Sequence, residues 1–197
     1  FSVLVIVIFS ISFGDLLGQK EIVDRLTPGV LWIAFVFAGT LGLSRAFTLE
    51  IENGCLEGLK LCPVDRGAIY TGKTISSALI MFAVEILTIP AFMVLFNYNI
   101  QNIAGLALVI ILGTLGFITV GTLLSALTVN TRTREIMLPI LLLPLVIPVI
   151  IPAVMATGKI LVDGSIGDIL SELRLLLVYD LIFFVIGHLI FEYVIQD

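Results

Sequence analysis

The segment LEIENGCLEGLKLCPVDRGAIYTGK, residues 49–73, is a polar stretch that lies between two long apolar runs. Residues 28–47 before it carry a single charge, Arg45, and residues 74–96 after it carry a single charge, Glu85. A helix of about 20 apolar residues is long enough to cross the hydrocarbon core of a bilayer. The sequence therefore predicts two membrane-spanning helices that meet water at the polar segment.

The polar segment has a helical pattern of its own. Its leucines recur at helical spacing with charged side chains beside them; these residues are Leu49, Leu56 and Leu59, and Glu50, Glu52, Glu57 and Lys60. Gly54 interrupts the pattern and Pro63 ends it. This pattern predicts a short amphipathic helix along the membrane surface. An ordinary hairpin with a solvated charged face is the alternative that the spacing leaves open.

Composition predicts the class of protein before any motif does. Of 197 residues, 59% are hydrophobic and 13% are charged, which is far more apolar than a soluble domain of this length. The apolar runs are continuous, which argues against a water-filled barrel. Backbone polar groups in lipid must bond within their own segment, so the predicted fold is all-α. The net charge of −5 includes no basic stripe that would favour nucleic acid.

Motifs that carry chemistry are absent from the sequence. Both cysteines, Cys55 and Cys62, lie in the polar segment, and the single histidine, His188, lies far from them. A structural zinc site needs four ligands, so we interpret the cysteines as reduced, unpaired thiols of a cytosolic loop. No phosphate-binding G-x-x-x-x-G-K-[ST] motif occurs, so this chain does not bind ATP in that way. We expect no enzymatic activity and no resident cofactor.

Hydropathy predicts six spans in a single transmembrane domain that covers residues 1–197. The spans are residues 1–13, 28–47, 74–96, 103–129, 136–157 and 173–195. The first is too short to cross alone and opens with Phe1 instead of Met. We therefore expect the natural N-terminus and the start of the first span to be missing.

Local signals describe several of these spans. Thr27 and Pro28 predict the start of the second span, and Trp32 lies one turn further, at a depth that suits an interfacial anchor. The fourth span has a small-residue face that favours close helix packing. That face consists of Gly105, Gly113, Gly116, Gly121 and Ser125.

The fifth span and the connection after it have distinct patterns. Pro139, Pro144, Pro148 and Pro152 predict that the fifth span is bent, and we expect it to line a moving interface or a pathway. Ser165 and Asp168 form a capping-box pattern, followed by an apolar face. That face consists of Ile166, Ile169, Leu170 and Leu173. These residues predict a second surface helix directly before the last span.

The distribution of lysine and arginine predicts the orientation. One side of the membrane collects six of them and the other side four. They are Arg45, Lys60, Arg66, Lys73, Arg132 and Arg134 on the first side, and Lys20, Arg25, Lys159 and Arg174 on the second. Because cytoplasmic loops carry the excess, residues 49–73, residues 130–135 and the C-terminus are predicted to be cytoplasmic. Residues 14–27 and 158–171 are predicted to face outward.

Three ionisable side chains are predicted to be buried within spans, Glu85, Asp180 and His188, and Glu192 lies near a membrane face. A charge at mid-span costs roughly 2.5–3.5 kcal/mol unless it is paired or hydrated, so such residues face a bundle interior or a wet cavity. Glu85 is a candidate gating or substrate residue, or else a hydrogen-bonded structural acid. His188 is four residues before Glu192 on one helix face, so a local pair competes with haem ligation as its role.

Three stretches together resemble CcmB, the membrane subunit of the ABC transporter of cytochrome c maturation. ENGCLEGLKLCPVDRGAIYTGK, residues 52–73, resembles the family's pattern of an acidic residue, Gly, Leu-Glu, Leu, Pro and a later Lys. MLPILLLPLVIPVII, residues 137–151, resembles the family's Leu-Pro-Leu-x-Ile-Pro run and is the most specific part. FEYVIQD, residues 191–197, follows a long apolar helix as in the family. The similarity extends over nearly the whole chain.

The resemblance implies a six-helix ABC permease of the bacterial or organellar inner membrane. It implies a cytosolic coupling helix between the second and third spans and a short outward helix before the sixth. The expected partners are a CcmA-like ATPase, a CcmC-like haem-handling protein, a CcmD-like small protein and a CcmE-like haem chaperone. ATP hydrolysis by the partner would drive haem export or release of the loaded chaperone, with haem as a handled substrate.

This interpretation gives two groups of candidate residues. The expected ATPase-coupling residues are Glu50, Gly54, Leu56, Glu57 and Leu59. The expected pathway or gating residues are Glu85, Pro144, Pro148, Asp180 and His188. An ion-driven secondary transporter, which needs paired intramembrane charges and an inverted repeat, and a passive scaffold for haem-handling partners are the rival hypotheses. A neighbouring reading frame for a P-loop ATPase would favour the ABC transporter over both.

Overall fold

The computed structural model describes residues 2–12, 20–52, 58, 65–97, 102–128, 134–162 and 164–194. Its elements are α1 (Ser2–Ser12), α2 (Lys20–Glu52), α4 (Arg66–Phe96), α5 (Ile103–Thr128), α6 (Arg134–Leu161), η2 (Ile166–Ile169) and α7 (Leu170–Val194). The described residues contain helices and no strand. The predicted all-α class is therefore confirmed.

Five described helices are long and apolar enough to cross a membrane. The candidate spans are Arg25–Arg45, Gly67–Phe96, Ile103–Thr128, Ile136–Leu161 and Ile166–Phe191. The shorter apolar helix α1 stands where the sequence predicted the remainder of a first span. The polytopic membrane class is confirmed, and the described chain presents five full-length candidate spans beside this short helix.

Three helices are longer than hydropathy predicted, and one of them, α6, continues past Thr157 to Leu161. The helix α2 begins at Lys20 instead of Pro28 and continues past Phe47 to Glu52, so Pro28 lies inside it. Pro28 cannot donate a backbone hydrogen bond, yet the chain is helical on both sides of it. The helix α4 begins at Arg66 instead of Thr74. Hydropathy marks where a helix leaves the apolar region and gives no signal for helical turns that extend beyond it.

The start of α4 has a local cause in the sequence. The carboxylate of Asp65 accepts a hydrogen bond from the Gly67 backbone N–H at 3.2 Å. Aspartate is a favoured N-cap because its oxygen satisfies one of the free amide groups of the first turn. The polar residues 66–73 therefore belong to a helix that continues into the membrane span.

The helix α5 lies at the centre of the bundle and packs against α2, α4, α6 and α7. Its glycines admit large side chains from the neighbouring helices. A Cβ on Gly113 would overlap the Trp32 ring, and a Cβ on Gly121 would overlap Leu43. At Gly116 a Cβ would lie 2.5 Å from Asp180 Oδ1. The predicted small-residue face thus permits close helix packing, on more than one side of α5.

Trp32 is not the interfacial anchor that its position suggested. Its side chain is 2% exposed, and its indole Nε1–H donates to the Thr157 hydroxyl of α6 at 3.0 Å. The ring meets Phe35 edge-on, with centroids 5.7 Å apart. Because Gly113 leaves room for the indole, Trp32 points into the bundle and fastens α2 to α6.

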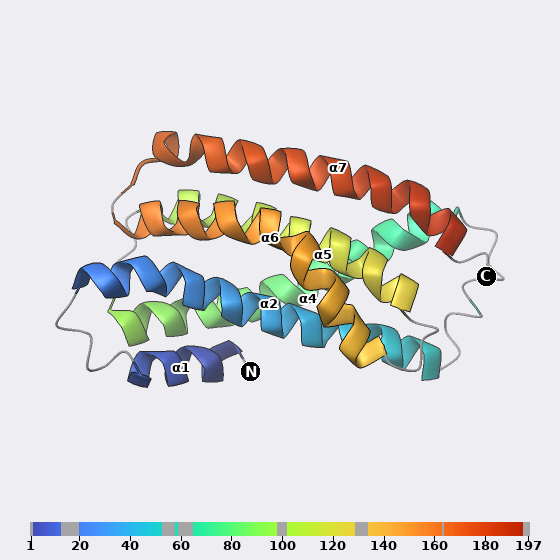
Figure 1. Cartoon of the computed structure of the whole chain (residues 1–197), viewed down its shortest axis with the longest axis horizontal. Helices are drawn as coiled ribbons and strands as arrows, with labels where there is room; N and C mark the ends of the chain where they lie inside the picture. Colours follow the sequence, from blue (N-terminus) through green and yellow to red (C-terminus); the bar gives the residue numbers. More distant parts are fainter. Residues whose placement is uncertain are drawn as a thin grey trace.

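The helix α6 contains all four prolines of the predicted fifth span and is continuous from Arg134 to Leu161. Figure 1 shows that it changes direction within its N-terminal half, as proline-rich helices do. The Tyr179 hydroxyl of α7 donates to the Leu145 carbonyl in this region at 2.6 Å. A side chain of the neighbouring helix therefore supports the backbone between the prolines.

The helix ends form two groups (Figure 1). The ends of α2, α5 and α7 and the beginnings of α4 and α6 lie at one end of the bundle, on the right of the view. The beginnings of α2, α5 and α7 and the ends of α4 and α6 lie at the other. This grouping agrees with the alternation of sides that the sequence predicted for successive connections.

The second end is closed by a polar clamp between α6 and α7. Lys159 Nζ donates to the Asp168 carbonyl at 2.9 Å and forms an ion pair with Glu172 Oε1 at 2.6 Å. The predicted capping box is present: the Ser165 N–H and hydroxyl both donate to Asp168 Oδ2 at 2.8 Å. The short helix before the last span is the single 3-10 turn η2, and it runs directly into α7.

We expect Gly113→Ala to lower the free energy of unfolding by about 1–3 kcal/mol, because the added Cβ must displace the buried Trp32 ring. Gly42→Ala in α2 is the control, since nothing lies within 4 Å of a Cβ there. It should be neutral or stabilising by about 1 kcal/mol through helix propensity. Unfolding in mixed detergent micelles measures both variants, and equal stability would contradict the packing described for α5.

Candidate functional site

The predicted coupling residues lie largely outside the described part of the chain. Glu50 belongs to the last turns of α2, and only its backbone is described. Gly54, Leu56, Glu57 and Leu59 fall outside the described residues. Gly58, which is described, is helical and exposed. The end of α2 and the start of α4 lie at the same end of the bundle, so residues 53–65 connect two spans there.

Glu85 lies in α4, inside the bundle and away from the lipid-facing surface. It is 1% exposed, and the Thr114 hydroxyl of α5 donates a hydrogen bond to its Oε1. Among the described residues its Oε2 has no hydrogen-bond partner. A mid-span acid is expected to face protein, and the Glu85–Thr114 pair places it against the central helix.

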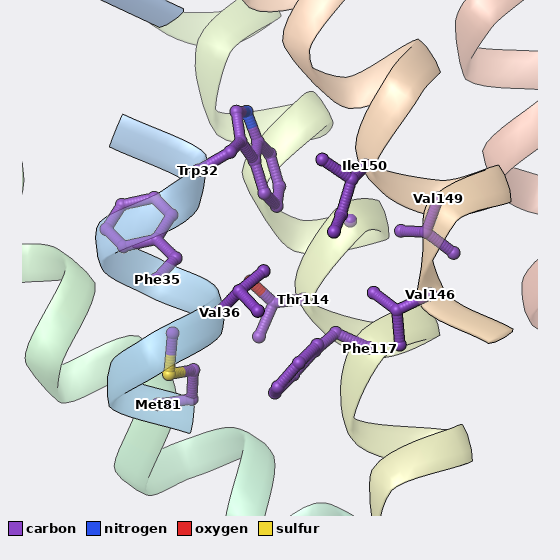
Figure 2. Close-up of a pocket in the computed structure, with 10 residues that line it drawn as sticks. Trp32, Phe35, Val36, Met81, Thr114, Phe117, Val146, Val149 and Ile150 are labelled. Atoms are coloured by element: carbon purple, nitrogen blue, oxygen red, sulfur yellow. The ribbon is translucent and has the colours of Figure 1, made fainter. Parts of the chain in front are cut away.

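A small apolar pocket adjoins this pair (Figure 2). Thr114 lines it together with side chains from four helices. The others are Trp32, Phe35 and Val36 of α2, Met81 of α4, Gly113 and Phe117 of α5, and Val146, Val149 and Ile150 of α6. Its volume of about 10 Å³ is at the lower limit for one water molecule. In this conformation the pocket has no room for a substrate.

Asp180 of α7 lies on the other side of α5. Neither carboxylate oxygen has a hydrogen-bond partner among the described residues, and Oδ1 lies against Gly116. Thr114 and Gly116 are two residues apart, which places them about 200° apart around the α5 axis. The structure therefore does not bring Glu85 and Asp180 together, and one acid has its carboxylate against each side of the central helix.

A groove of about 350 Å³ runs between α4, α5 and α7 beside Asp180. Its walls are mostly apolar, with Thr74 and Thr119 at the edges and Phe82 and Phe184 among the larger side chains. Several of its lining residues, such as Leu79 and Leu181, are more than half exposed. The groove is thus open sideways, toward the region that lipid occupies.

His188 packs against the first turn of α4. A Cβ on Gly67 would overlap its imidazole, and its ring is nearly parallel to Phe184, with centroids 6.4 Å apart. Its Nδ1 has no hydrogen-bond partner among the described residues. The side chain of Glu192, the expected partner, lies outside the described side chains. His188 is therefore a contact between α7 and α4 in this structure.

Pro144 and Pro148 lie apart from the buried acids. Both are exposed on the outer face of α6, whereas Pro152 is buried. The predicted pathway residues therefore occupy separate places: Glu85 and Asp180 against α5, His188 against α4, and the two prolines on the surface. Within the described ranges, no group of three or more His, Cys, Asp or Glu could hold a metal ion.

Sequence reasoning missed Tyr70, which the structure places in a buried contact. Tyr70 is fully buried, and its hydroxyl donates to the Thr119 carbonyl of α5 at 3.0 Å. A Cβ on Gly187 of α7 would overlap this hydroxyl. Tyr70 falls in the polar segment, where an aromatic residue gives no sign of burial, and the glycine that receives it is more than 100 residues away.

These features define a class: a polytopic, all-α membrane protein in which the carboxylates of two acids, Glu85 and Asp180, are buried on opposite sides of a central, glycine-rich helix. The family described as CcmB protein matches residues 1–193, so the chain belongs to the CcmB family. This confirms the family that the polar segment, the proline run and the C-terminal stretch resembled.

Curated relatives carry the name Heme exporter protein B. The protein from Rhodobacter capsulatus is 33% identical over 140 residues, and that from Pseudomonas aeruginosa is 29% identical over 144 residues. These alignments cover 71% and 73% of this chain but 63% of each relative, so the chain spans less than two thirds of their length. The Escherichia coli protein of the same name is 31% identical over 76 residues, which are 39% of this chain and 33% of that protein.

The Glu85–Thr114 pair makes a stability prediction. Thr114→Val removes the donor that satisfies a buried acid, so it should cost about 1–3 kcal/mol when Glu85 is present. In a Glu85→Met background the same change should cost much less, because no acid then lacks a partner. Unfolding of the single and double variants in mixed micelles measures this coupling. If the losses in unfolding free energy of the two single variants add up to that of the double variant, Glu85 and Thr114 do not stabilise each other.

Proposed function

We propose that this chain is the membrane subunit of an ABC transporter in cytochrome c biogenesis. In this function it couples ATP hydrolysis by a partner subunit to haem export or to release of a haem-loaded chaperone. The observation that carries the proposal is the CcmB match over residues 1–193, together with relatives named Heme exporter protein B. The bundle of candidate spans is the kind of fold such a subunit needs.

ATP hydrolysis is assigned to a separate, CcmA-like subunit. The sequence contains no P-loop, so this chain is proposed to act as a transport subunit without enzymatic activity of its own. An ATPase without membrane segments can move a membrane subunit only through contacts at the cytosolic face. We propose residues 53–65 for such a contact, because the helices that they connect, α2 and α4, end and begin at the same end of the bundle.

The proposed coupling contact has an apolar centre and a charged rim. Leu56 and Leu59 would occupy a groove of the ATPase, and Glu50 and Glu57 would meet basic or amide groups around it. Each buried leucine contributes about 1.5–3 kcal/mol, whereas an exposed rim charge contributes about 1 kcal/mol or less. Gly54 would permit close approach where a side chain would obstruct it.

Haem is proposed as the handled substrate, and CcmC-, CcmD- and CcmE-like proteins as further partners. The membrane is proposed to be the inner membrane, with residues 49–73 and the C-terminus in the cytoplasm. Glu85 and Asp180 are proposed to act in gating, because a rearrangement around α5 would change the surroundings of both acids. An ion-driven transporter is less well supported, since these acids lie on opposite sides of α5 instead of forming a paired site.

The coupling contact predicts unequal effects of substitution. We expect Leu56→Asp and Leu59→Asp to abolish ATPase binding and cytochrome c production, because a charge cannot occupy an apolar groove. Glu57→Ala should lose only a rim contact and keep most of both activities. The measurements are pull-down of the ATPase subunit and cytochrome c yield, with membrane insertion of each variant as the control. Full binding and full yield in both leucine variants would mean that residues 53–65 are only a hairpin.

The proposed orientation is tested by Cys55 and Cys62. Both lie in residues 49–73, so a membrane-impermeant thiol reagent added outside intact cells should leave them unlabelled. The same reagent should label them in inverted inner-membrane vesicles. Labelling from outside in intact cells would show that residues 49–73 face outward and would contradict the proposed orientation.

A further inference from the structure

The helices α4 and α7 meet through two glycine–ring contacts that run in opposite directions. Gly67 of α4 receives the His188 ring of α7, and Gly187 of α7 receives the Tyr70 ring of α4. A Cβ at either glycine would overlap the facing ring. Each helix thus supplies one ring and one glycine, and we call these four residues the α4–α7 interlock.

The Tyr70 half of the interlock is held by contacts with α5 and α7. Tyr70 has no exposed surface, and its hydroxyl donates to the Thr119 carbonyl of α5 at 3.0 Å. Its ring packs on Phe191 of α7, with centroids 5.3 Å apart. Sliding α7 along α4 would press the tyrosine against the backbone at Gly187, so sliding is blocked.

The interlock lies at the beginning of α4, which follows residues 53–65 in the sequence. Gly67 is the second residue of α4, and its backbone N–H bonds to the capping carboxylate of Asp65. Tyr70 follows one turn later. A displacement of residues 53–65 therefore reaches the interlock before it reaches any deeper part of α4.

We propose that the α4–α7 interlock makes these two helices move as one body and so carries a displacement of residues 53–65 to α7. This inference rests on the proposed function, because the displacement comes from the ATPase subunit. The motion then reaches Asp180 beside Gly116 and the Tyr179 contact with Leu145 of α6. Tyr70, Gly187, Gly67 and His188 are positioning residues in this scheme and touch no substrate.

Three glycine substitutions distinguish the effect of the interlock from that of ordinary helix packing. In Gly187→Ala the new methyl group would overlap the Tyr70 ring. The hydrogen bond of Tyr70 to the Thr119 carbonyl holds this ring in place, so α4 and α7 must move apart. In Gly67→Ala the new methyl group would overlap the His188 ring. This ring can rotate away, so the separation of α4 and α7 should be smaller. Gly72→Ala on α4 is the matched control, because nothing lies within 4 Å of a Cβ there.

The first measurement is the coupling ratio, the amount of haem-loaded chaperone released per ATP hydrolysed in the purified complex. We expect Gly187→Ala to lower this ratio by about tenfold while ATP hydrolysis continues. A change of this size is within the range that substitutions along a coupling network produce. Gly72→Ala should leave the ratio unchanged. Tyr70→Leu in the Gly187→Ala background removes the clash and should restore part of the ratio.

The second measurement is the distance between spin labels on the full chain in its complex, after replacement of both native cysteines by serine. Labels at the exposed positions Ala68 and Leu189 report α4 and α7, and a label at Ile140 reports α6. On addition of nucleotide, the 68–140 distance should change and the 68–189 distance should stay constant. In Gly187→Ala the 68–189 distance should become nucleotide-dependent, which a loss of stability alone does not produce.

The outcomes distinguish the inference from the function on which it rests. If no ATPase subunit binds the unsubstituted chain, the proposed function fails and the interlock proposal fails with it. If the ATPase binds but the 68–189 distance changes with nucleotide in the unsubstituted chain, only the interlock proposal is overturned. A constant 68–140 distance, or a Gly187→Ala coupling ratio equal to that of Gly72→Ala, overturns it as well.

Discussion

Close approach of helices to α5 is the constraint on which this bundle depends. Lipid is as apolar as the side chains, so helices in a membrane gain little from hydrophobic burial and are held by packing and by hydrogen bonds. The glycines of α5 let neighbouring helices supply large groups at short range. These groups are Trp32 opposite Gly113, Asp180 opposite Gly116 and Leu43 opposite Gly121. A larger residue at any of these positions would separate α5 from the neighbour that faces it.

The same closeness explains how polar groups are distributed. Helices at short range can exchange hydrogen bonds across the bundle, as Trp32 does with Thr157 and Tyr179 does with the Leu145 carbonyl. Glu85 has one such partner in Thr114, and Asp180 has none among the described residues. Acids that are buried with incomplete partners are expensive in a membrane, so their surroundings are where a second conformation would differ most.

The sequence predicted the all-α membrane class and most span boundaries, because apolar runs of this length have few other solutions. It did not predict that α2, α4 and α6 continue past the ends of the predicted spans, since hydropathy gives no signal for helical turns in water. It placed Glu85 at a depth where an acid must face protein. It misplaced Trp32, because depth along a helix does not determine which side of the helix faces lipid. Contacts such as Tyr70 with Gly187 depend on the rotation of two distant helices and leave no local pattern.

The polar clamp between α6 and α7 has a mechanical consequence. Lys159 and Glu172 hold the beginning of α7, whereas His188 meets α4 near the opposite end. A rod that is fastened at one end and pushed at the other swings as a lever about the fastened end. Asp180 lies midway between Glu172 and His188, so in the proposed motion it would travel about half as far as the pushed end, given a constant rise per residue. A shift of a few ångströms at the interlock would thus become a smaller, graded movement at the buried acid.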